Sequence, residues 1–122
     1  MSDIAAANVI VTQTFADESP GLLQNGDSLN TPYITFGNGS LTYPTYGVPL
    51  PDLGQFRLKF GIKRIHITPT AFTHYWVYDP TPRTANPVAP NGTLRAYALN
   101  GGAQMSGAIT ANTKLYLTVI GA

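Results

Sequence analysis

The residues best suited to proton transfer lie in one short aromatic stretch, His74-Tyr75-Trp76-Val77-Tyr78-Asp79. An imidazole beside a carboxylate could act as a general acid–base pair, and both groups can bind a metal ion. Successive side chains of a strand, however, point to opposite faces of a sheet. His74 therefore shares a face with Trp76 and Tyr78, whereas Asp79 lies on the other face. Alternation separates the two groups that this chemistry would need.

The other candidates for catalysis are scattered along the chain. His66 lies between two isoleucines on the polar face of a predicted strand, and no spaced ligand motif joins it to His74 or Asp79 as a metal site. The only adjacent acids are Asp17 and Glu18, so a glycosidase pair would require two distant carboxylates. There is no nucleophile elbow and no phosphate loop. We therefore expect a protein that is not an enzyme and binds no cofactor or metal.

Composition indicates a single folded domain with a weakly charged surface. The chain has 122 residues, of which 43% are hydrophobic and 11% charged, and its net charge is +1. Soluble domains typically carry about a quarter charged residues, so Thr, Asn, Gln and Ser must cover much of this surface. Weak charge favours self-association or a large permanent interface. A net charge this small argues against a nucleic-acid partner, and the absence of cysteine excludes disulfides.

The N-terminal residues carry no targeting signal. The first eight have neither a basic region nor an apolar run, so they do not form a signal peptide. No apolar stretch approaches the roughly 20 residues that span a bilayer. We expect synthesis in a cytoplasm, no export and no membrane partner. Residues 1–8 are expected to form a flexible, extended N-terminal arm that orders on binding.

Hydrophobic alternation predicts an all-β fold. The expected strands comprise residues 9–15, 33–36, 40–43, 57–67, 74–78, 93–97 and 113–120. In the fourth, Leu58, Phe60 and Ile62 should face inward, and the alternation changes phase at Lys63-Arg64, which predicts a β-bulge or a corner. Turns are predicted at four Asn-Gly pairs, which begin at Asn25, Asn38, Asn91 and Asn100. Short strands separated by such turns indicate one antiparallel β-sandwich or barrel with long loops over residues 1–122.

Two long connections interrupt this pattern. Residues 16–30 form a polar connection, and residues 79–92 contain four prolines that predict a stiff, extended, projecting loop.

Acidic and basic residues are segregated along the chain. Residues 1–30 hold four acids without a base, whereas the basic strand at residues 57–64 holds four bases without an acid. The basic strand could be a solvated face, or it could meet an acidic surface on a neighbouring copy or a partner.

Residues 41–53 are the most conspicuous stretch, because they are apolar and aromatic and yet contain three prolines. Proline removes a backbone donor, so this stretch cannot form a helix or a central strand. So much hydrophobic side chain on such a backbone predicts a segment that docks on another polypeptide. The expected contact residues at a partner or subunit interface, including two nearby bases, are Tyr43, Pro44, Tyr46, Val48, Pro49, Leu50, Arg57 and Lys59.

The aromatic residues allow a second interpretation. The chain has seven tyrosines and one tryptophan. Exposed rings beside Asn and Asp could stack on sugars, as in a small carbohydrate-binding module. Alternatively, Trp76 and Tyr116 fill the core and the other rings pack at subunit contacts, where aromatic residues are enriched.

Four stretches carry a resemblance to a known family: FGNGSLTYPTYGVPL at residues 36–50, the basic strand that follows, the element ending in Tyr78-Asp79, and LRAY at residues 94–97. They resemble the small capsid cement, or head decoration, proteins of tailed bacteriophages. The resemblance extends from about residue 31 to the C-terminus, and residues 42–45 and 47–50 match best. Tyr46 stands where the family more often has a small residue, and the loop 79–92 is longer than usual.

The resemblance implies an all-β homotrimer that binds the major capsid protein on the outside of the expanded head. Such a protein covers junctions between capsid subunits, resists the pressure of packaged DNA and catalyses no reaction. We therefore expect a structural protein of the virion, made in the cytoplasm of the host bacterium, with residues 41–53 as its contact segment. The alternative is a small lectin-like, carbohydrate-binding β module of a virion.

Overall fold

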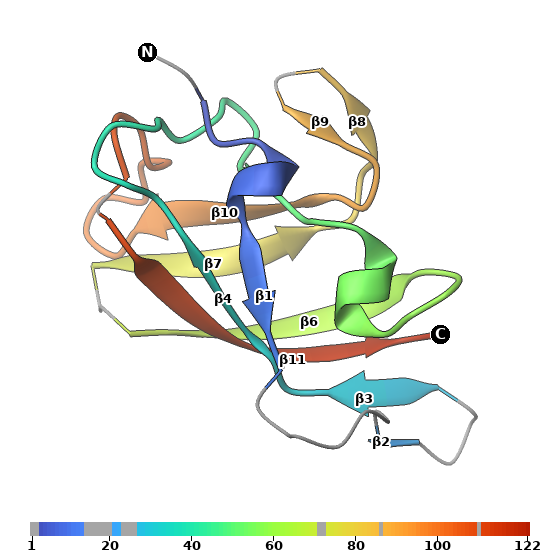
Figure 1. Cartoon of the computed structure of the whole chain (residues 1–122). Helices are drawn as coiled ribbons and strands as arrows, with labels where there is room; N and C mark the ends of the chain where they lie inside the picture. The colour runs from blue at the N-terminus through green and yellow to red at the C-terminus, as the bar shows by residue number, and fades with distance from the viewer. Residues whose placement is uncertain (1–2, 14–20, 23–26, 71–72, 86, 110) are drawn as a thin grey trace.

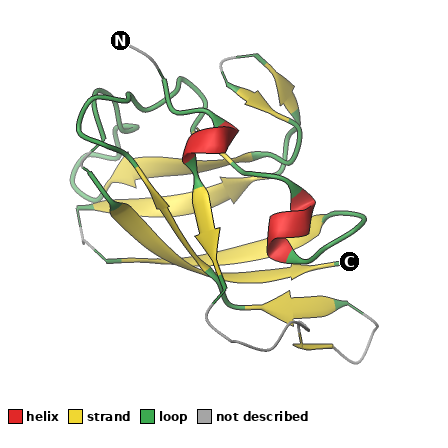
Figure 2. Ribbon diagram, in the orientation of Figure 1, coloured by secondary structure: helices red, strands yellow, loops and turns green. Residues whose placement is uncertain are grey.

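The structure is a computed structural model that describes residues 3–13, 21–22, 27–70, 73–85, 87–109 and 111–122. Within these residues the regular elements are antiparallel strands and two single-turn 3-10 helices, η1 (Ala6–Asn8) and η2 (Leu53–Phe56) (Figure 2). The sheets are curled into a half-barrel (Figure 1). The all-β, antiparallel sandwich or barrel class predicted from the sequence is confirmed.

The larger sheet is organised around one long C-terminal strand, β11. Its six strands are β1 (Ile10–Thr12), β2 (Gly21–Leu22), β3 (Ser28–Asn30), β4 (Tyr33–Phe36), β6 (Ile62–Pro69) and β11 (Thr113–Gly121). One edge of β11 pairs with β6, and the other edge pairs with β4 and then with β3. Alternation along β11 turns Leu115, Leu117 and Val119 toward the interior.

A smaller sheet covers the other side of the core. Its strands, in the order β5-β10-β7, are β5 (Val48–Pro49), β10 (Thr93–Ala98) and β7 (His74–Asp79). Leu94 and Ala96 of β10 face inward and join the side chains of β11 and β4 in one hydrophobic cluster. The outer face of this sheet is therefore formed by the alternate residues of β7 and β10.

The predicted bulge lies at Lys63. β6 and β11 keep one register from Pro69 to Arg64, and the register then shifts so that Gly121 pairs with Ile62. Lys63 is the extra residue between these two pairs, which is the geometry of a β-bulge. The residue opposite the bulge is Gly121. Only glycine is accommodated there, because a Cβ atom would collide with the carbonyl oxygen of Gly61. The β-bulge or corner predicted from the change of phase at Lys63-Arg64 is therefore confirmed as a bulge.

The strand expected over residues 57–62 is wrong, because β6 begins at Ile62. Arg57 ends η2 in the left-handed conformation, at a φ of 59°. The backbone N–H groups of Lys59, Phe60 and Gly61 then all donate to the carbonyl of Ala122, at 3.2, 2.6 and 3.0 Å. A backbone that wraps around one acceptor cannot form a ladder. Phe60 is consequently 84% exposed, not inward-facing as the alternation predicted.

The N-terminal residues are part of the folded body. Ile4 is buried in the core, and its N–H donates to the carbonyl of Thr42 at 3.0 Å. Thr42 also donates its hydroxyl hydrogen to the carboxylate of Asp3. The expected flexible arm is therefore wrong for residues 3–8. Residues 40–43, expected as a strand, form only isolated bridges at Thr42.

The two long connections contain short strands. Residues 79–92 form a small hairpin of β8 (Arg83–Thr84) and β9 (Val88–Ala89), which stands away from the two sheets in Figure 1. Part of the loop that was expected to be extended is therefore paired, and Ala89 within it is buried. Residues 16–30 include β2 and β3. The acids Asp17 and Glu18 and the turn at Asn25 lie outside the described residues.

Candidate binding surface

The proline-rich segment, residues 41–53, is packed into the chain's own core. Val48 is 0% and Leu50 1% exposed, and Tyr43, Pro44 and Pro49 are also buried. The expectation that these five side chains contact another polypeptide is therefore wrong. The physical reason is that Val48 and Pro49 form an edge strand, where proline is tolerated because only one side of the backbone must pair.

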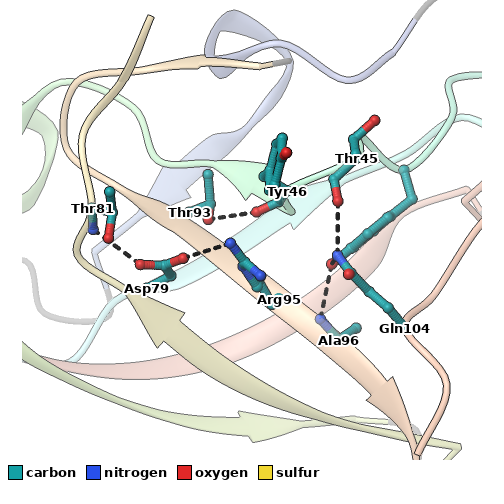
Figure 3. Close-up of polar contacts among 9 residues, drawn as sticks. Thr45, Tyr46, Asp79, Thr81, Thr93, Arg95, Ala96 and Gln104 are labelled. Atoms are coloured by element: carbon teal, nitrogen blue, oxygen red, sulfur yellow. Dashed lines mark hydrogen bonds and ion pairs between the residues drawn. The ribbon is translucent and has the colours of Figure 1, made fainter. Parts of the chain in front are cut away.

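Hydrogen bonds join the segment to β10 and to Gln104 (Figure 3). The hydroxyl of Tyr43 accepts hydrogen bonds from the backbone N–H of Ala96 at 3.1 Å and from Nε2 of Gln104 at 2.8 Å. Thr93 donates its hydroxyl hydrogen to the carbonyl of Tyr46 at 2.7 Å. Burial raises the pKa of Tyr43, although the hydrogen bonds from Ala96 and Gln104 act in the opposite direction. The segment therefore belongs to the structural frame of the protein.

Tyr46 is the exception within the segment. It lies half-buried in the turn between Pro44 and Gly47, where Gly47 has a φ of 107°. The guanidinium carbon of Arg83 lies 3.4 Å from the centre of the Tyr46 ring, and that of Arg95 lies 5.5 Å from it. Both are cation–π contacts. Of the six expected contact residues in the segment, Tyr46 alone reaches the surface.

The outer face of the smaller sheet exposes aromatic and apolar side chains. Tyr75 is 45% and Val77 41% exposed on β7. The register places Tyr97 opposite Tyr75 and Arg95 opposite Val77 on β10. The Tyr75 and Tyr97 rings stack, with centres 5.5 Å apart and planes at 25°. We define the aromatic–arginine face as Tyr46, Tyr75, Val77, Arg83, Arg95 and Tyr97.

The two arginines of this face have different environments. Arg95 forms an ion pair with Asp79 at 2.8 Å (Figure 3). The pKa of Asp79 lies below its usual value, first because the backbone N–H of Thr81 donates to its carboxylate and also because Arg95 lies beside it. Arg83, by contrast, has no ion pair among the described residues. The Nε atoms of both arginines are buried without a hydrogen-bond partner among those residues.

The expected basic contacts lie elsewhere. Arg57 ends η2 and Lys59 follows in the loop that binds the carbonyl of Ala122. Lys63 of the basic strand forms an ion pair at 2.8 Å with the buried carboxylate of Asp27. One contact between the acidic and basic regions of the sequence is therefore made within a single chain.

The candidates for catalysis do not converge. His66 is exposed on β6, and Nδ1 of half-buried His74 on β7 lies 3.0 Å from the hydroxyl of Thr73. Asp79 is paired with Arg95 on the opposite face of β7 from His74. In the part of the chain that the structure describes, no three acidic or histidine side chains are placed to hold a metal ion.

A cleft of about 600 Å³ opens at one end of the half-barrel. Trp76, Met105 and Leu115 form its apolar part, and His74 and Asn112 contribute polar groups. Trp76 also packs edge-on against Phe36, with ring centres 5.7 Å apart. Trp76 therefore lies between the core and the cleft, which is a suitable position for stacking on a ring-shaped ligand.

Tyr116 was expected in the core together with Trp76, and that expectation is wrong. Tyr116 is 45% exposed on the outer face of the larger sheet, edge-on to Tyr33 at 5.9 Å. Lys114 lies above the Tyr33 ring, its ammonium nitrogen 4.4 Å from the centre. The position follows from alternation along β11, because Leu115 and Leu117 take the inward positions.

Comparisons with known proteins identify no relative: no family model, no curated protein and no solved structure matches the chain. Among the described residues, none of the helices is long and apolar enough to cross a membrane. The site therefore rests on its own geometry. Sequence reasoning missed Arg83, Arg95 and Val77, although the alternation of residues 74–79 and 93–98 would have placed two of them opposite the core.

Proposed function

We propose that this chain is a non-catalytic structural protein that binds the outer surface of a tailed-phage capsid as a homotrimer and stabilises the expanded head. The contact residues are assigned to the aromatic–arginine face in place of residues 41–53. The observation that supports this surface is the Tyr75–Tyr97 stack beside Arg95 on the smaller sheet, where Tyr75 is 45% and Val77 41% exposed. Tyr and Arg are enriched in protein interfaces and among their energetically dominant residues.

The composition and the family resemblance support the same proposal. A surface poor in charge tolerates close contact with another protein, because few ions lose their hydration. Three copies in one assembly would present the face three times, so that modest contacts combine into strong avidity. The major capsid protein is the partner that the resemblance implies.

The test compares two tyrosines with equal exposure. Tyr75 and Tyr116 are each 45% exposed, each beside a second tyrosine, but on different sheets. Tyr75→Ser should weaken co-sedimentation with expanded heads about 30-fold, the loss typical of a dominant interface residue. Tyr116→Ser should bind as the original chain does. Equal weakening by both variants, or unchanged binding by Tyr75→Ser, would contradict the assignment of the face.

The oligomeric state is tested separately. The mass of one chain is 13.0 kDa, and sedimentation equilibrium of the purified chain should give three times that mass. A monomer at micromolar concentration that still stabilised expanded heads would contradict the trimer and leave the capsid proposal standing. Heads that retain the same resistance to osmotic shock with and without the protein would contradict the stabilising function.

A carbohydrate-binding module is the second candidate, supported by the cleft beside Trp76. A sugar ring could stack on the indole while His74 and Asn112 bind its hydroxyl groups. Trp76 is the only tryptophan in the chain, so its fluorescence reports on the cleft without interference. Saturable quenching by a glycan, together with normal head binding by Tyr75→Ser, would favour this function over the first.

A further inference from the structure

We propose that Arg83 is the recognition site for a carboxylate, the side chain of an Asp or Glu, on the protein surface that the aromatic–arginine face binds. This inference deepens the proposed function and rests on it, because it names the chemistry of the partner at one position of the face. It differs from the expectation that residues 57–64 meet an acidic surface.

The first support is the orientation of the guanidinium. Its central carbon lies 3.4 Å from the centre of the Tyr46 ring, so the two planar groups are in close contact. A guanidinium held against a ring has lost part of its rotational freedom before any partner arrives. Its N–H groups lie in the plane of the guanidinium, so contact with the face of the ring does not use their hydrogen-bonding capacity. Arginine in this arrangement is suited to bind a carboxylate through two parallel hydrogen bonds.

The second support is the balance of charge at Tyr46. Arg83 and Arg95 both approach this ring, whereas Asp79 is the carboxylate that pairs with Arg95, at 2.8 Å. The cluster therefore has two positive groups and one negative group. Among the described residues, the Arg83 guanidinium contacts the Tyr46 ring and forms no ion pair. A carboxylate on the partner would complete the pairing in the same way as Asp79 does for Arg95.

The third support is an unsatisfied donor. The Nε of Arg83 is buried and makes no hydrogen bond to the residues that the structure describes. Buried donors of this kind are uncommon, because each costs the free energy of its lost hydration. The Nε of Arg95 is in the same state, but the guanidinium of Arg95 already pairs with Asp79, so Arg83 is the arginine of this face whose charge a partner's carboxylate would neutralise.

The position of Arg83 makes it accessible to a partner on this face. It lies on β8 in the hairpin that stands away from the sheets at the ends of β7 and β10 (Figure 1). Arg83 itself is half-buried and its partner across the hairpin, Ala89, is buried, whereas the next pair, Thr84 and Val88, is exposed. A protein lying against Tyr75 and Val77 and reaching this hairpin would bring its own side chains to the Tyr46 ring.

The experiment uses a matched pair of substitutions. Arg83→Gln removes the charge at Tyr46 but keeps a planar polar group, and Lys114→Gln removes the cation above the Tyr33 ring on the other sheet. Affinity for expanded heads is measured at increasing sodium chloride concentrations, with circular dichroism as the check of folding. Arg83→Gln should lower the affinity about tenfold and reduce its salt dependence, because a charged hydrogen bond is lost. Lys114→Gln should change neither quantity.

A second measurement does not require heads. The Nε–Hε resonance of Arg83 is followed by NMR while sodium acetate replaces sodium chloride at constant ionic strength. A saturable shift at Arg83, larger than that at exposed Arg64, supports the carboxylate site. Equal shifts at the two arginines would overturn it, even if the original chain does not bind heads and the proposed function has failed.

The remaining outcomes separate the two proposals. If the original chain and Arg83→Gln bind heads with equal affinity, the inference is overturned and the proposed function stands. If Arg83→Gln loses self-association but keeps its affinity for heads, the carboxylate belongs to a second copy of this chain, and the assignment to a different protein is overturned.

Discussion

The proline-rich segment and the outer face of the smaller sheet are both rich in apolar and aromatic residues, but the first is buried and the second is exposed to solvent. Residues 41–53 place their apolar side chains in the core, because an edge strand accepts Pro49 and two donors reach the hydroxyl of Tyr43. The outer face leaves Tyr75 and Val77 in solvent, because their strand already buries its other side. Hydrophobic composition alone therefore indicates burial, whereas apolar residues on both faces of a strand indicate a surface available to a partner.

The largest effect should come from the core of the segment. Leu50→Ala removes a side chain that is 1% exposed and should lower the free energy of unfolding by about 2–5 kcal/mol. Val77→Ala on the outer face should change it by less than about 0.5 kcal/mol. Urea denaturation of the two variants measures both values. Similar losses would show that the two regions do not differ as the structure indicates.

A smaller loss should follow from the turn that presents Tyr46. Gly47 has a φ of 107°, and an added Cβ would lie 2.6 Å from the carbonyl oxygen of Leu94. Gly47→Ala should therefore destabilise the chain by about 3 kcal/mol, from backbone strain and the collision together. Gly101→Ala is the control, because Gly101 has a φ of 91° but no atom within 4 Å of an added Cβ. An equal loss of stability in Gly47→Ala and Gly101→Ala would show that the positive φ alone, and not the collision with Leu94, causes the effect.

The Tyr43 hydroxyl should contribute less. Tyr43→Phe leaves the N–H of Ala96 and the amide of Gln104 without their acceptor, which should cost about 1–3 kcal/mol. Burial raises the pKa of Tyr43 above its ordinary value of 10.0, so the folded chain holds this proton more tightly than the unfolded chain does. Stability should therefore decrease as the pH rises above 10.0. Thermal unfolding between pH 8 and 11 should show a smaller decrease in Tyr43→Phe.

Asp79 should have the smallest effect. Its folded-state pKa lies below the ordinary value of 3.8, so its stabilisation is present above that pH and is lost as the pH falls through the folded-state pKa. Asp79→Asn should cost about 0.5–1 kcal/mol at neutral pH, because both partners are partly solvated. The variant should also be less sensitive to acid below pH 3.8 than the original chain. Identical acid unfolding curves would show that the Asp79–Arg95 pair does not stabilise the fold.

Local patterns predicted the strands but not the non-local packing. The alternation in residues 33–36, 74–78, 93–97 and 113–120 gave four strands almost to the residue, and the change of phase at Lys63-Arg64 gave the bulge. The strand over 57–62 failed because the Ala122 carbonyl, far along the chain, takes its three donors. No local pattern contains that acceptor.

Of the eight contact residues expected from the sequence, the aromatic–arginine face contains only Tyr46. Its contact with Arg83 and Arg95 depends on how β5, β8 and β10 lie in space, and η2, β6 and β7 separate β5 from β8 in the sequence. The burial of Tyr43 likewise depends on Ala96 and Gln104, more than fifty residues away. Composition could show that residues 41–53 would be removed from water, but it could not show which surface would cover them.

The bulge at Lys63 has a consequence for how the fold could change. Without Lys63, Ile62, Arg64 and Ile65 would alternate as in an ordinary strand, and β6 could pair with β11 in one continuous register. Bulges increase local twist, so a shortened chain should have a flatter sheet where Ile62 pairs with Gly121. An in-frame deletion of a single codon should therefore reduce the curl of the larger sheet at this end, and it would also remove the Lys63–Asp27 ion pair.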